Sequence, residues 1–329
     1  MYKHNIVNFE LCNYSIRHGR YGGQAGDKDG IIYNDEYWIA KYPKSTKSMQ
    51  GTALPLYTSS PLSEYIGSHI YEILDFPVHK TLLGIRNNQL IVACKDFQNN
   101  FGDLAEIRTL KNAANKQIAD IAEENLPESA TGDKIVLEEL LLHFDKNPLF
   151  WTKGLEKQFW SMVIIDILIG NNDRNNGNWG VLFDEKSNQY IPAPVYDNGN
   201  AFNNKTNDAR ISELLNENDV NKILGERTIY TYKGKLLSAK KIIELDIPQL
   251  QHTLIELFPI IESKLDKIES FIDSIPCKFN NINIISEDRK KYYNKTLEQR
   301  TFELLKPAYE KAIVLYNPKE VNCYEIPLD

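Results

Sequence analysis

A long apolar segment followed at once by a polar loop is the feature that most restricts the fold of this chain. Residues Phe159–Ile169 are mostly apolar, with Asp166 as the one charged residue, and the run is too short to cross a bilayer. The periodicity predicts a buried helix over Leu155–Ile169. Residues 170–200 then contain two polar loops that flank a short hairpin. The first of these loops therefore follows directly on a buried helix.

This first loop, GNNDRNNGNWG, has the residue types that phosphoryl transfer to a hydroxyl requires. The reaction needs a carboxylate that orients the nucleophile and accepts its proton, and an oxygen ligand for a metal ion a few residues later. Asp173 and Asn178 have the D-x-x-x-x-N spacing with which protein kinases meet both needs. Taken alone, such a loop is more often a simple turn in an asparagine-rich chain.

The second loop strengthens this interpretation, because it holds an aspartate where kinases hold their main magnesium ligand. Asp197 lies in YDNG, at the end of a strand-like run and about two dozen residues beyond Asp173. Protein kinases carry the aspartate of their D-F-G sequence in this position, with a hairpin in between. A lone Asp-Asn-Gly is usually a turn, but the ordered series of helix, loop, hairpin and loop seldom arises by chance.

The N-terminal part supplies two residues that kinases use together with these loops. Lys41, in WIAKYP, is on a predicted strand, where a kinase places the lysine that contacts the α- and β-phosphates of ATP. Glu64, in the first turn of the next predicted helix, is the candidate partner of this lysine. Each residue alone has an ordinary explanation, since strand lysines mostly face solvent and a glutamate in a first turn complements the helix dipole.

Two further segments are candidates for contact with the nucleotide. The glycine-rich turn at residues 19–30 is not a Walker P-loop, because it lacks GxxxxGK[S/T], but its backbone N–H groups are suited to cover phosphates. The run IVACKDF is a candidate hinge whose backbone would hold adenine, although an edge strand ending in a turn has the same pattern. The candidate nucleotide-binding residues in the two segments are Gly22, Gly23, Gln24, Ala25, Lys95, Asp96 and Phe97.

The chain as a whole predicts a β-rich front and a helical back. Residues 6–97 contain short strand-like runs, a hairpin around Asn34-Asp35 and one helix, SEYIGSHIYEIL. From residue 101 onward the periodicity is helical, with a polar loop at 123–133 and little strand signal between 236 and 316. This order predicts an α+β fold with two lobes, residues 1–97 and 98–329.

Composition argues against several other classes of function. The formal net charge of −7 disfavours direct binding to nucleic acid or to an anionic membrane. The four cysteines form no CxxC pair, so they predict neither a zinc site nor a disulfide framework, and they fit a reducing compartment. The N-terminal residues lack the apolar stretch of a signal peptide. We therefore expect a cytoplasmic location, with export as an effector as the alternative.

In this order the segments resemble those of HipA-like kinases, and most closely the compact CtkA/HipT-type branch. The resemblance is carried by YGGQAGDK, WIAKYP, SEYIGSHIYEIL, IVACKDF, GNNDRNNGNWG and PAPVYDNG. It implies a two-lobed, protein-kinase-like (HipA-like) fold and an ATP-dependent Ser/Thr protein kinase. It also implies that Asp173 is the catalytic base and that Lys41, paired with Glu64, contacts the phosphates of ATP. Asn178 and Asp197 would hold Mg²⁺.

The resemblance further implies partners and regulation. Family members often phosphorylate themselves, and often act as toxins on a translation factor or tRNA synthetase, with a HipB-like antitoxin as partner. Self-inhibition in the glycine-rich loop is not available here, because residues 19–30 contain no Ser or Thr. Weaker candidates are Ser45, Thr46 and Ser48. The chain also has Asn175 where the family loop commonly has His, and asparagine cannot take up a proton near neutral pH.

Three alternatives remain open from the sequence. A phosphoinositide or other small-molecule kinase also uses a D-R-x-x-x-N loop, but it predicts a basic substrate face, and the loop offers little beyond Arg174. A pseudokinase or nucleotide-binding interaction module would lack part of the acidic set, which is complete here. A purely structural protein would leave the ordered placement of these residues as coincidence.

Overall fold

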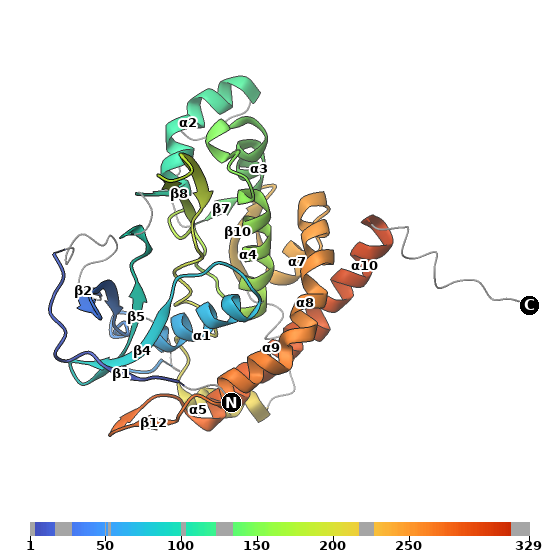
Figure 1. Cartoon of the computed structure of the whole chain (residues 1–329). Helices are drawn as coiled ribbons and strands as arrows, with labels where there is room; N and C mark the ends of the chain where they lie inside the picture. The colour runs from blue at the N-terminus through green and yellow to red at the C-terminus, as the bar shows by residue number, and fades with distance from the viewer. Residues whose placement is uncertain are drawn as a thin grey trace, which may run out of the picture.

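The computed structural model describes residues 4–16, 28–49, 51, 54–99, 103–122, 134–216 and 227–316. Its front part is a five-stranded sheet with strand order β1-β4-β5-β3-β2, antiparallel except for the β1–β4 pair. The strands are β1 (Val7–Asn8), β2 (Lys28–Tyr33), β3 (Glu36–Lys41), β4 (Thr81–Arg86) and β5 (Gln89–Lys95). Figure 1 shows this sheet, in blue to teal, beside the mainly helical remainder of the chain. The expected division at residue 97 stays a prediction, although the sheet itself ends at Lys95.

The β2–β3 hairpin confirms the prediction of a turn at Asn34-Asp35. Both residues have left-handed backbone angles, with φ of 50° and 60°, as the tight turn of a two-residue hairpin requires. Strand β2, the first strand of this hairpin, is longer than expected. It begins at Lys28, so residues 28–30 pair with β3 and do not form part of the glycine-rich turn. Residues 17–27, which hold Gly22, Gly23, Gln24 and Ala25, lie outside the described residues.

Helix α1 (Ser60–Ile73) lies between the sheet and helix α8 (Pro248–Asp273), and this packing sets the side of the sheet on which Lys41 lies. Alternate residues of β3, Trp38 and Ala40, join a small cluster on the far side of the sheet. Their neighbour Ile39 packs with the main core that includes α1, so Lys41 is on the α1 side as well. The helix begins earlier than the sequence suggested, with Pro61 in its first turn, and Glu64 is therefore in its second turn.

The central helix α4 has the bounds that were predicted, Leu155–Ile169. It begins after Gly154 and ends at Gly170, which have φ of 85° and 66° and so allow a sharp chain reversal at each end. The helix is buried on nearly all sides, including Asp166, because α8, α9, the π-helix that follows α9, and β9 pack against it. The two polar loops thus start from a fixed point in the core.

The back part is mainly helical, as expected. One hydrophobic core runs from α1 through α4 into the C-terminal helices, and α8 contacts α4, α9 and α10. The remaining helices are α2 (Ile107–Ala122), α3 (Leu137–Lys146), α5 (Asp208–Asn216), α7 (Ala239–Ile243), α8 (Pro248–Asp273), α9 (Glu287–Gln299), the π-helix η3 (Arg300–Leu305) and α10 (Lys306–Tyr316), with short 3₁₀ turns η1 (Phe97–Asn99) and η2 (Pro148–Phe150). Within the described part of the chain, no helix is both long and apolar enough to cross a membrane.

The short hairpin predicted between the two polar loops is confirmed as β8 (Gly180–Asp184) and β9 (Gln189–Pro192), but the prediction of few other strands in the back part was incomplete. Among the described residues, three small sheets occur there. The pair between β7 and β10 is parallel and joins segments far apart in the sequence. Runs this short have no periodicity of their own and form only because tertiary contacts pair them. The strands are β6 (Leu104–Glu106), β7 (Ile135–Val136), β8 (Gly180–Asp184), β9 (Gln189–Pro192), β10 (Arg227–Tyr232), β11 (Lys235–Ser238), β12 (Lys278–Phe279) and β13 (Ile282–Asn283). The loop predicted at 123–133 lies outside the described residues.

Candidate active site

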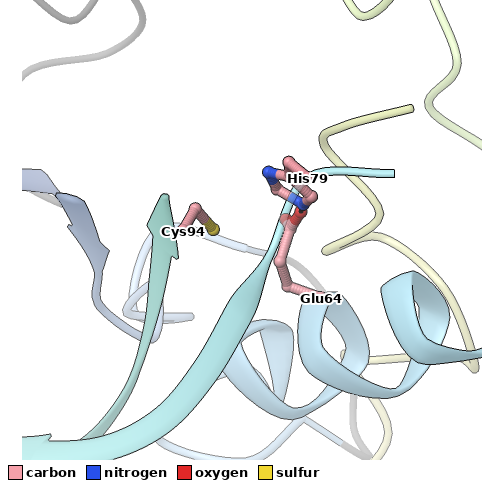
Figure 2. Close-up of side chains that lie close together, drawn as sticks. All are labelled: Glu64, His79 and Cys94. Carbon is pink, nitrogen blue, oxygen red and sulfur yellow. Dashed lines mark ion pairs between the residues drawn. The ribbon is translucent and has the colours of Figure 1, made fainter. Parts of the chain in front are cut away.

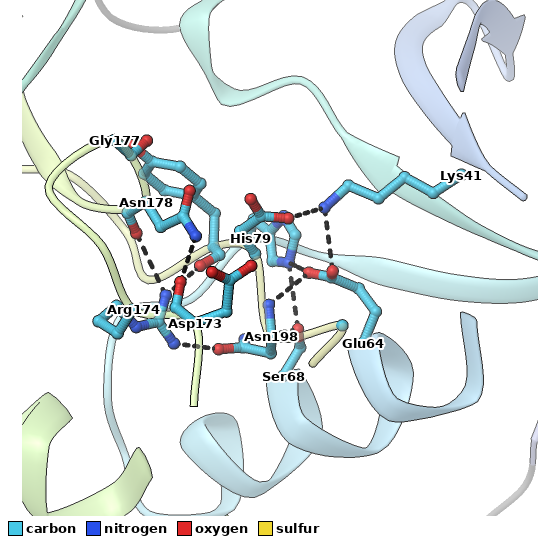
Figure 3. A network of polar contacts seen from close by, with 12 residues as sticks. Lys41, Glu64, Ser68, His79, Asp173, Arg174, Gly177, Asn178 and Asn198 are labelled. Carbon is cyan, nitrogen blue, oxygen red and sulfur yellow. Dashed lines mark hydrogen bonds and ion pairs between the residues drawn. The ribbon is translucent and has the colours of Figure 1, made fainter. Parts of the chain in front are cut away.

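Strand β3, helix α1 and the loop after β9 bring three charged side chains together. The Lys41 Nζ donates to Glu64 Oε2 at 2.9 Å and to Asp197 Oδ1 at 2.8 Å (Figure 3). Burial opposes the charge of Lys41, but the carboxylates of Asp197 and Glu64 outweigh this effect and raise the pKa of Lys41 well above its ordinary value. The contact expected between Lys41 and Glu64 is therefore present, and Asp197 shares the same ammonium group.

The Glu64 carboxylate is buried and has partners at both oxygens. Besides the Lys41 contact, Glu64 Oε1 accepts from the backbone N–H of Asn198 at 3.0 Å and lies 3.0 Å from His79 Nε2. Burial alone would raise the pKa of Glu64, but the charge of Lys41 and the hydrogen bond from His79 outweigh it, so the pKa is lowered. The same His79 Nε2 is 3.1 Å from Ser68 Oγ, which accepts from Asn198 Nδ2 at 3.0 Å. Glu64 is thus held in place independently of Lys41.

The carboxylate of Asp197 is more accessible than that of Glu64. The two side chains are 37% and 1% exposed. The Lys41 ammonium, opposed by burial, lowers the pKa of Asp197, so this group is ionised at neutral pH. Asp197 has a φ of 63°, an unusual backbone angle for a residue other than glycine, and the next backbone N–H is the one that binds Glu64. The ionised carboxylate of Asp197 is therefore accessible to solvent, at a residue whose left-handed backbone angle turns the chain.

A buried arginine connects the two polar loops to helix α4. Arg174 donates to both carboxylate oxygens of Asp166, from Nε at 2.8 Å and from Nη2 at 3.0 Å. Its Nη1 donates to the backbone carbonyls of Asn178, at 3.2 Å, and of Tyr196. Its Nη2 also donates to Asn198 Oδ1 at 2.5 Å. Burial opposes the charge on Arg174, but the Asp166 carboxylate outweighs it and raises the pKa.

This connecting role was missed at the sequence level. The loop sequence suggests Arg174 only as a basic contact for a substrate, yet its side chain is fully buried. A signal did exist: Asp166 is the one charged residue within an otherwise apolar run, and a buried carboxylate requires a partner. Tyr71 of α1 completes the group, since its hydroxyl donates to Asp166 Oδ1 at 2.9 Å.

Asp173 and Asn178 lie together in the first loop, as their spacing predicted. Asn178 Nδ2 donates to the backbone carbonyl of Asp173 at 2.5 Å, which fixes the amide nitrogen toward Asp173 (Figure 3). The Asp173 side chain is half-buried. Asn175, the departure from the family pattern, bridges the loop: its Oδ1 accepts from the Gly177 N–H at 2.9 Å and from Arg108 at 3.3 Å. Asn175 thus shapes the loop through hydrogen bonds that need no proton transfer.

The candidate hinge has fewer open groups than expected. The backbone N–H of Lys95 already donates to Lys80 and that of Asp96 to Tyr37, so neither is available to adenine in this structure. The Lys95 side chain is paired with Glu36 at 2.5 Å. Phe97 instead lies beside the second loop, with its ring 5.7 Å from that of Tyr196. Within this segment, the structure therefore favours Phe97 as the candidate for an adenine contact.

Three buried side chains near Lys41 have residue types that metal ions favour. The ligand atoms of Glu64, His79 and Cys94 lie within 4.8 Å of one another (Figure 2). Glu64, however, already balances the Lys41 ammonium, and burial raises the pKa of the Cys94 thiol, which disfavours the thiolate that a metal requires. This cluster is better explained as surroundings that hold the Glu64 carboxylate in place than as a metal site.

The comparison with known sequences and the comparison with solved structures both find the same relative. No family model matches the chain. The serine/threonine-protein kinase CtkA of Helicobacter pylori is 30% identical over 318 residues, which covers 94% of this chain and 89% of the relative. The crystal structure of the H. pylori proinflammatory kinase CtkA superposes with a TM-score of 0.80 at 28% identity, covering 94% of this chain and 99% of that one. HipA of Shewanella oneidensis, from a complex with HipB and operator DNA, has a TM-score of 0.45 at 13% identity, covering 92% and 67% of the two chains.

Proposed function

The chain belongs to the family of the serine/threonine-protein kinase CtkA, and from this premise we propose that it transfers the γ-phosphate of ATP to a serine or threonine hydroxyl of a protein. The observation that carries the proposal is the position of the Lys41 ammonium between Glu64 and Asp197. A lysine fixed by a helix glutamate and close to the metal-binding aspartate is the arrangement on which protein kinases depend.

In the proposed reaction Asp173 orients the accepting hydroxyl and takes up its proton. The backbone carbonyl of Asp173 accepts from Asn178 and from the Asn175 N–H, which holds the loop. The carboxylate is half-buried and accepts from Asn175 Nδ2 at 3.4 Å. A carboxylate in this position contributes by positioning the nucleophile as much as by removing a proton. Asn175 does not relay this proton, because its amide does not titrate.

The residues present fit a magnesium ion. Asp197 is ionised and partly exposed, and the hydrogen bond from Asn178 Nδ2 to Asp173 leaves the amide oxygen of Asn178 as the second candidate ligand. Arg174 Nη1 binds the backbone carbonyls of both Asn178 and Tyr196, which brings the two loops side by side. Oxygen ligands of this kind suit Mg²⁺, which when bound with ATP offsets the charge on the phosphates. Lys41 keeps its own charge throughout, since its pKa is raised.

Intact-mass measurement tests the proposed function. The purified chain is incubated with Mg-ATP and an array of Ser- and Thr-containing peptides, beside the Asp173→Asn variant. We expect phosphoryl groups to be added to peptides, or to the chain itself, by the wild type and not by the variant. Equal transfer by both proteins would contradict the assignment of Asp173, and transfer to phosphoinositides but not to peptides would favour the small-molecule alternative.

Several roles beyond phosphoryl transfer are implied by the family resemblance and stay predictions for this chain. These are the action of a toxin or exported effector, a translation factor or tRNA synthetase as substrate, a HipB-like partner, and self-phosphorylation. Among the candidate self-phosphorylation sites, Thr46 is buried and its hydroxyl is bonded within the loop, so Ser45 and Ser48 are the more open positions.

A further inference from the structure

A second charged group lies outside the candidate active site, where the segment after Asp197 meets the start of α1. Arg289, in the first turn of α9, is 7% exposed. Its Nε and Nη2 donate to Asp208 Oδ1 at 3.0 and 2.5 Å, and Nη2 also donates to the Thr206 carbonyl at 2.9 Å. Its Nη1 donates to Ser59 Oγ at 3.3 Å and to the Tyr293 hydroxyl at 3.4 Å.

These contacts use all the hydrogen-bonding capacity of the guanidinium group. Arginine has five N–H donors in a planar fork, and each of the three nitrogens of Arg289 is engaged here. The partners come from three separate elements: α9 itself, residues 206–208 and the residue that precedes α1. A lysine could not replace this arrangement, because a single ammonium cannot present donors in one plane to three elements.

The N-terminal end of α1 is tied to the same segment by a second set of contacts. Both the backbone N–H and the hydroxyl of Ser59 donate to the carbonyl of Asn204, at 2.8 and 3.2 Å. Gly199 passes so close to α1 that an added Cβ would lie 3.0 Å from Glu64 Oε2. The position of α1, and with it that of Glu64, is therefore linked to the conformation of residues 199–208.

In kinases controlled by phosphorylation, a phosphate on the segment after the metal-binding aspartate is bound by arginine, and this contact orders the segment and the helix that carries the glutamate. Here an aspartate of that segment already pairs with a buried arginine. We propose that the Asp208 carboxylate takes the place of such a phosphate, and that the Asp208–Arg289 pair holds α1 in its active position without prior modification. This inference rests on the proposed kinase function and concerns its regulation.

The environment of Asp208 makes the pair testable without disrupting the core. The Asp208 side chain is 56% exposed and, with Ser59 and Arg289, lines a cavity of about 890 Å³. An Asp208→Asn substitution therefore changes a charge at the cavity wall and leaves the packing intact. Glu213→Gln is the matched control, because Glu213 is on the same helix α5 and forms an exposed pair with Arg210.

The first test measures phosphoryl transfer to a peptide array together with ATP binding. We expect Asp208→Asn to lower kcat by about tenfold, which corresponds to ~1.4 kcal/mol, with little change in the KM for ATP. Asp208→Glu should restore most of the rate, and Glu213→Gln should match the wild type. Wild-type protein pretreated with a phosphatase should keep its full rate. A loss of activity after phosphatase treatment, or an Asp208→Asn rate equal to that of the control, would overturn the proposal.

A second readout separates this inference from the proposed function. Hydrogen exchange of the peptides that cover residues 55–66 and 203–212 reports the contacts of Arg289 whether or not the protein transfers phosphate. We expect faster exchange in both peptides for Asp208→Asn and unchanged exchange for Glu213→Gln. Unchanged exchange in Asp208→Asn would refute the link between the Asp208–Arg289 pair and α1. If exchange changes but the wild-type chain transfers no phosphate, the contacts of Arg289 are established, while the kinase function and the regulatory proposal that rests on it are refuted.

Discussion

Two of the carboxylate–cation pairs in the described part of the chain, Arg174–Asp166 and Lys41–Asp197, have opposite characters. The Arg174–Asp166 pair is fully buried, with side chains 0% and 2% exposed, and Arg174 also binds backbone and side-chain oxygens of both polar loops. The Lys41–Asp197 pair opens to solvent, with 17% and 37% exposure. The difference indicates different roles: the buried pair fixes the two loops, while the partly exposed pair keeps charged groups that a nucleotide and a metal ion can reach.

The largest expected effect comes from breaking the buried pair. Asp166→Asn removes the charge that balances Arg174 in the core, and breaking a buried pair in this way costs about 3–5 kcal/mol. The free energy of unfolding, measured by urea titration, should fall by that amount. Glu256→Gln is the control, because it breaks an exposed pair with Lys157 of the same helix α4 and should cost less than about 1 kcal/mol. Similar losses in the two variants would show that the Arg174 pair does not support the core.

A smaller effect on stability, but a large one on activity, is expected at the partly exposed pair. Lys41→Met removes the cation, yet Glu64 keeps its contacts with His79 and the Asn198 N–H, so the fold should persist. Phosphoryl transfer should fall by about 10²-fold or more, because the variant lacks a charge that stabilises the transition state. Thermal unfolding and a transfer assay are run in parallel. A variant that unfolds but retains specific activity in its folded fraction would reverse the comparison.

The pH dependence of stability gives a third and subtler distinction. The folded-state pKa values of Asp197 and Glu64 are lowered from ordinary values of 3.8 and 4.5. Carboxylates with lowered pKa values contribute stability above their ordinary values and lose it as the pH falls through the lowered ones. The stability difference between wild type and Lys41→Met should therefore shrink below about pH 4 and stay constant between pH 5 and 8. Urea titrations across this range check the trend, and a difference that grows on acidification would contradict it.

Sequence reasoning predicted the parts of this molecule in which local pattern and tertiary structure agree. Helix α4 is mostly apolar from Phe159 onward and was found with its correct ends, and the Asn34-Asp35 turn has residues that tolerate left-handed angles. The contact between Lys41 and Glu64 was predicted because the strand and the helix that carry them occur in the same order as in protein kinases. The resemblance to the compact CtkA/HipT-type branch is confirmed for CtkA.

The features that were missed depend on contacts between distant segments. His79 lies in a connection with no pattern of its own, and its contact with Glu64 exists only because α1 folds back on that connection. Arg289 looks like an ordinary polar helix residue in the sequence, and its partners are 81 and 230 positions away. Strands of two or three residues such as β6 and β7 are likewise created by their partners and carry no signal of their own.

Under the proposed function, two aspartates in neighbouring loops have different roles: Asp173 orients the accepting hydroxyl and Asp197 holds the metal ion. Calorimetric titration of Asp173→Asn and Asp197→Asn with ATP, in the presence and absence of Mg²⁺, tests this most directly. We predict that Asp173→Asn binds Mg-ATP as the wild type does, and that Asp197→Asn loses the part of the affinity that depends on magnesium. Magnesium-dependent binding that survives in Asp197→Asn and is lost in Asp173→Asn would contradict these roles.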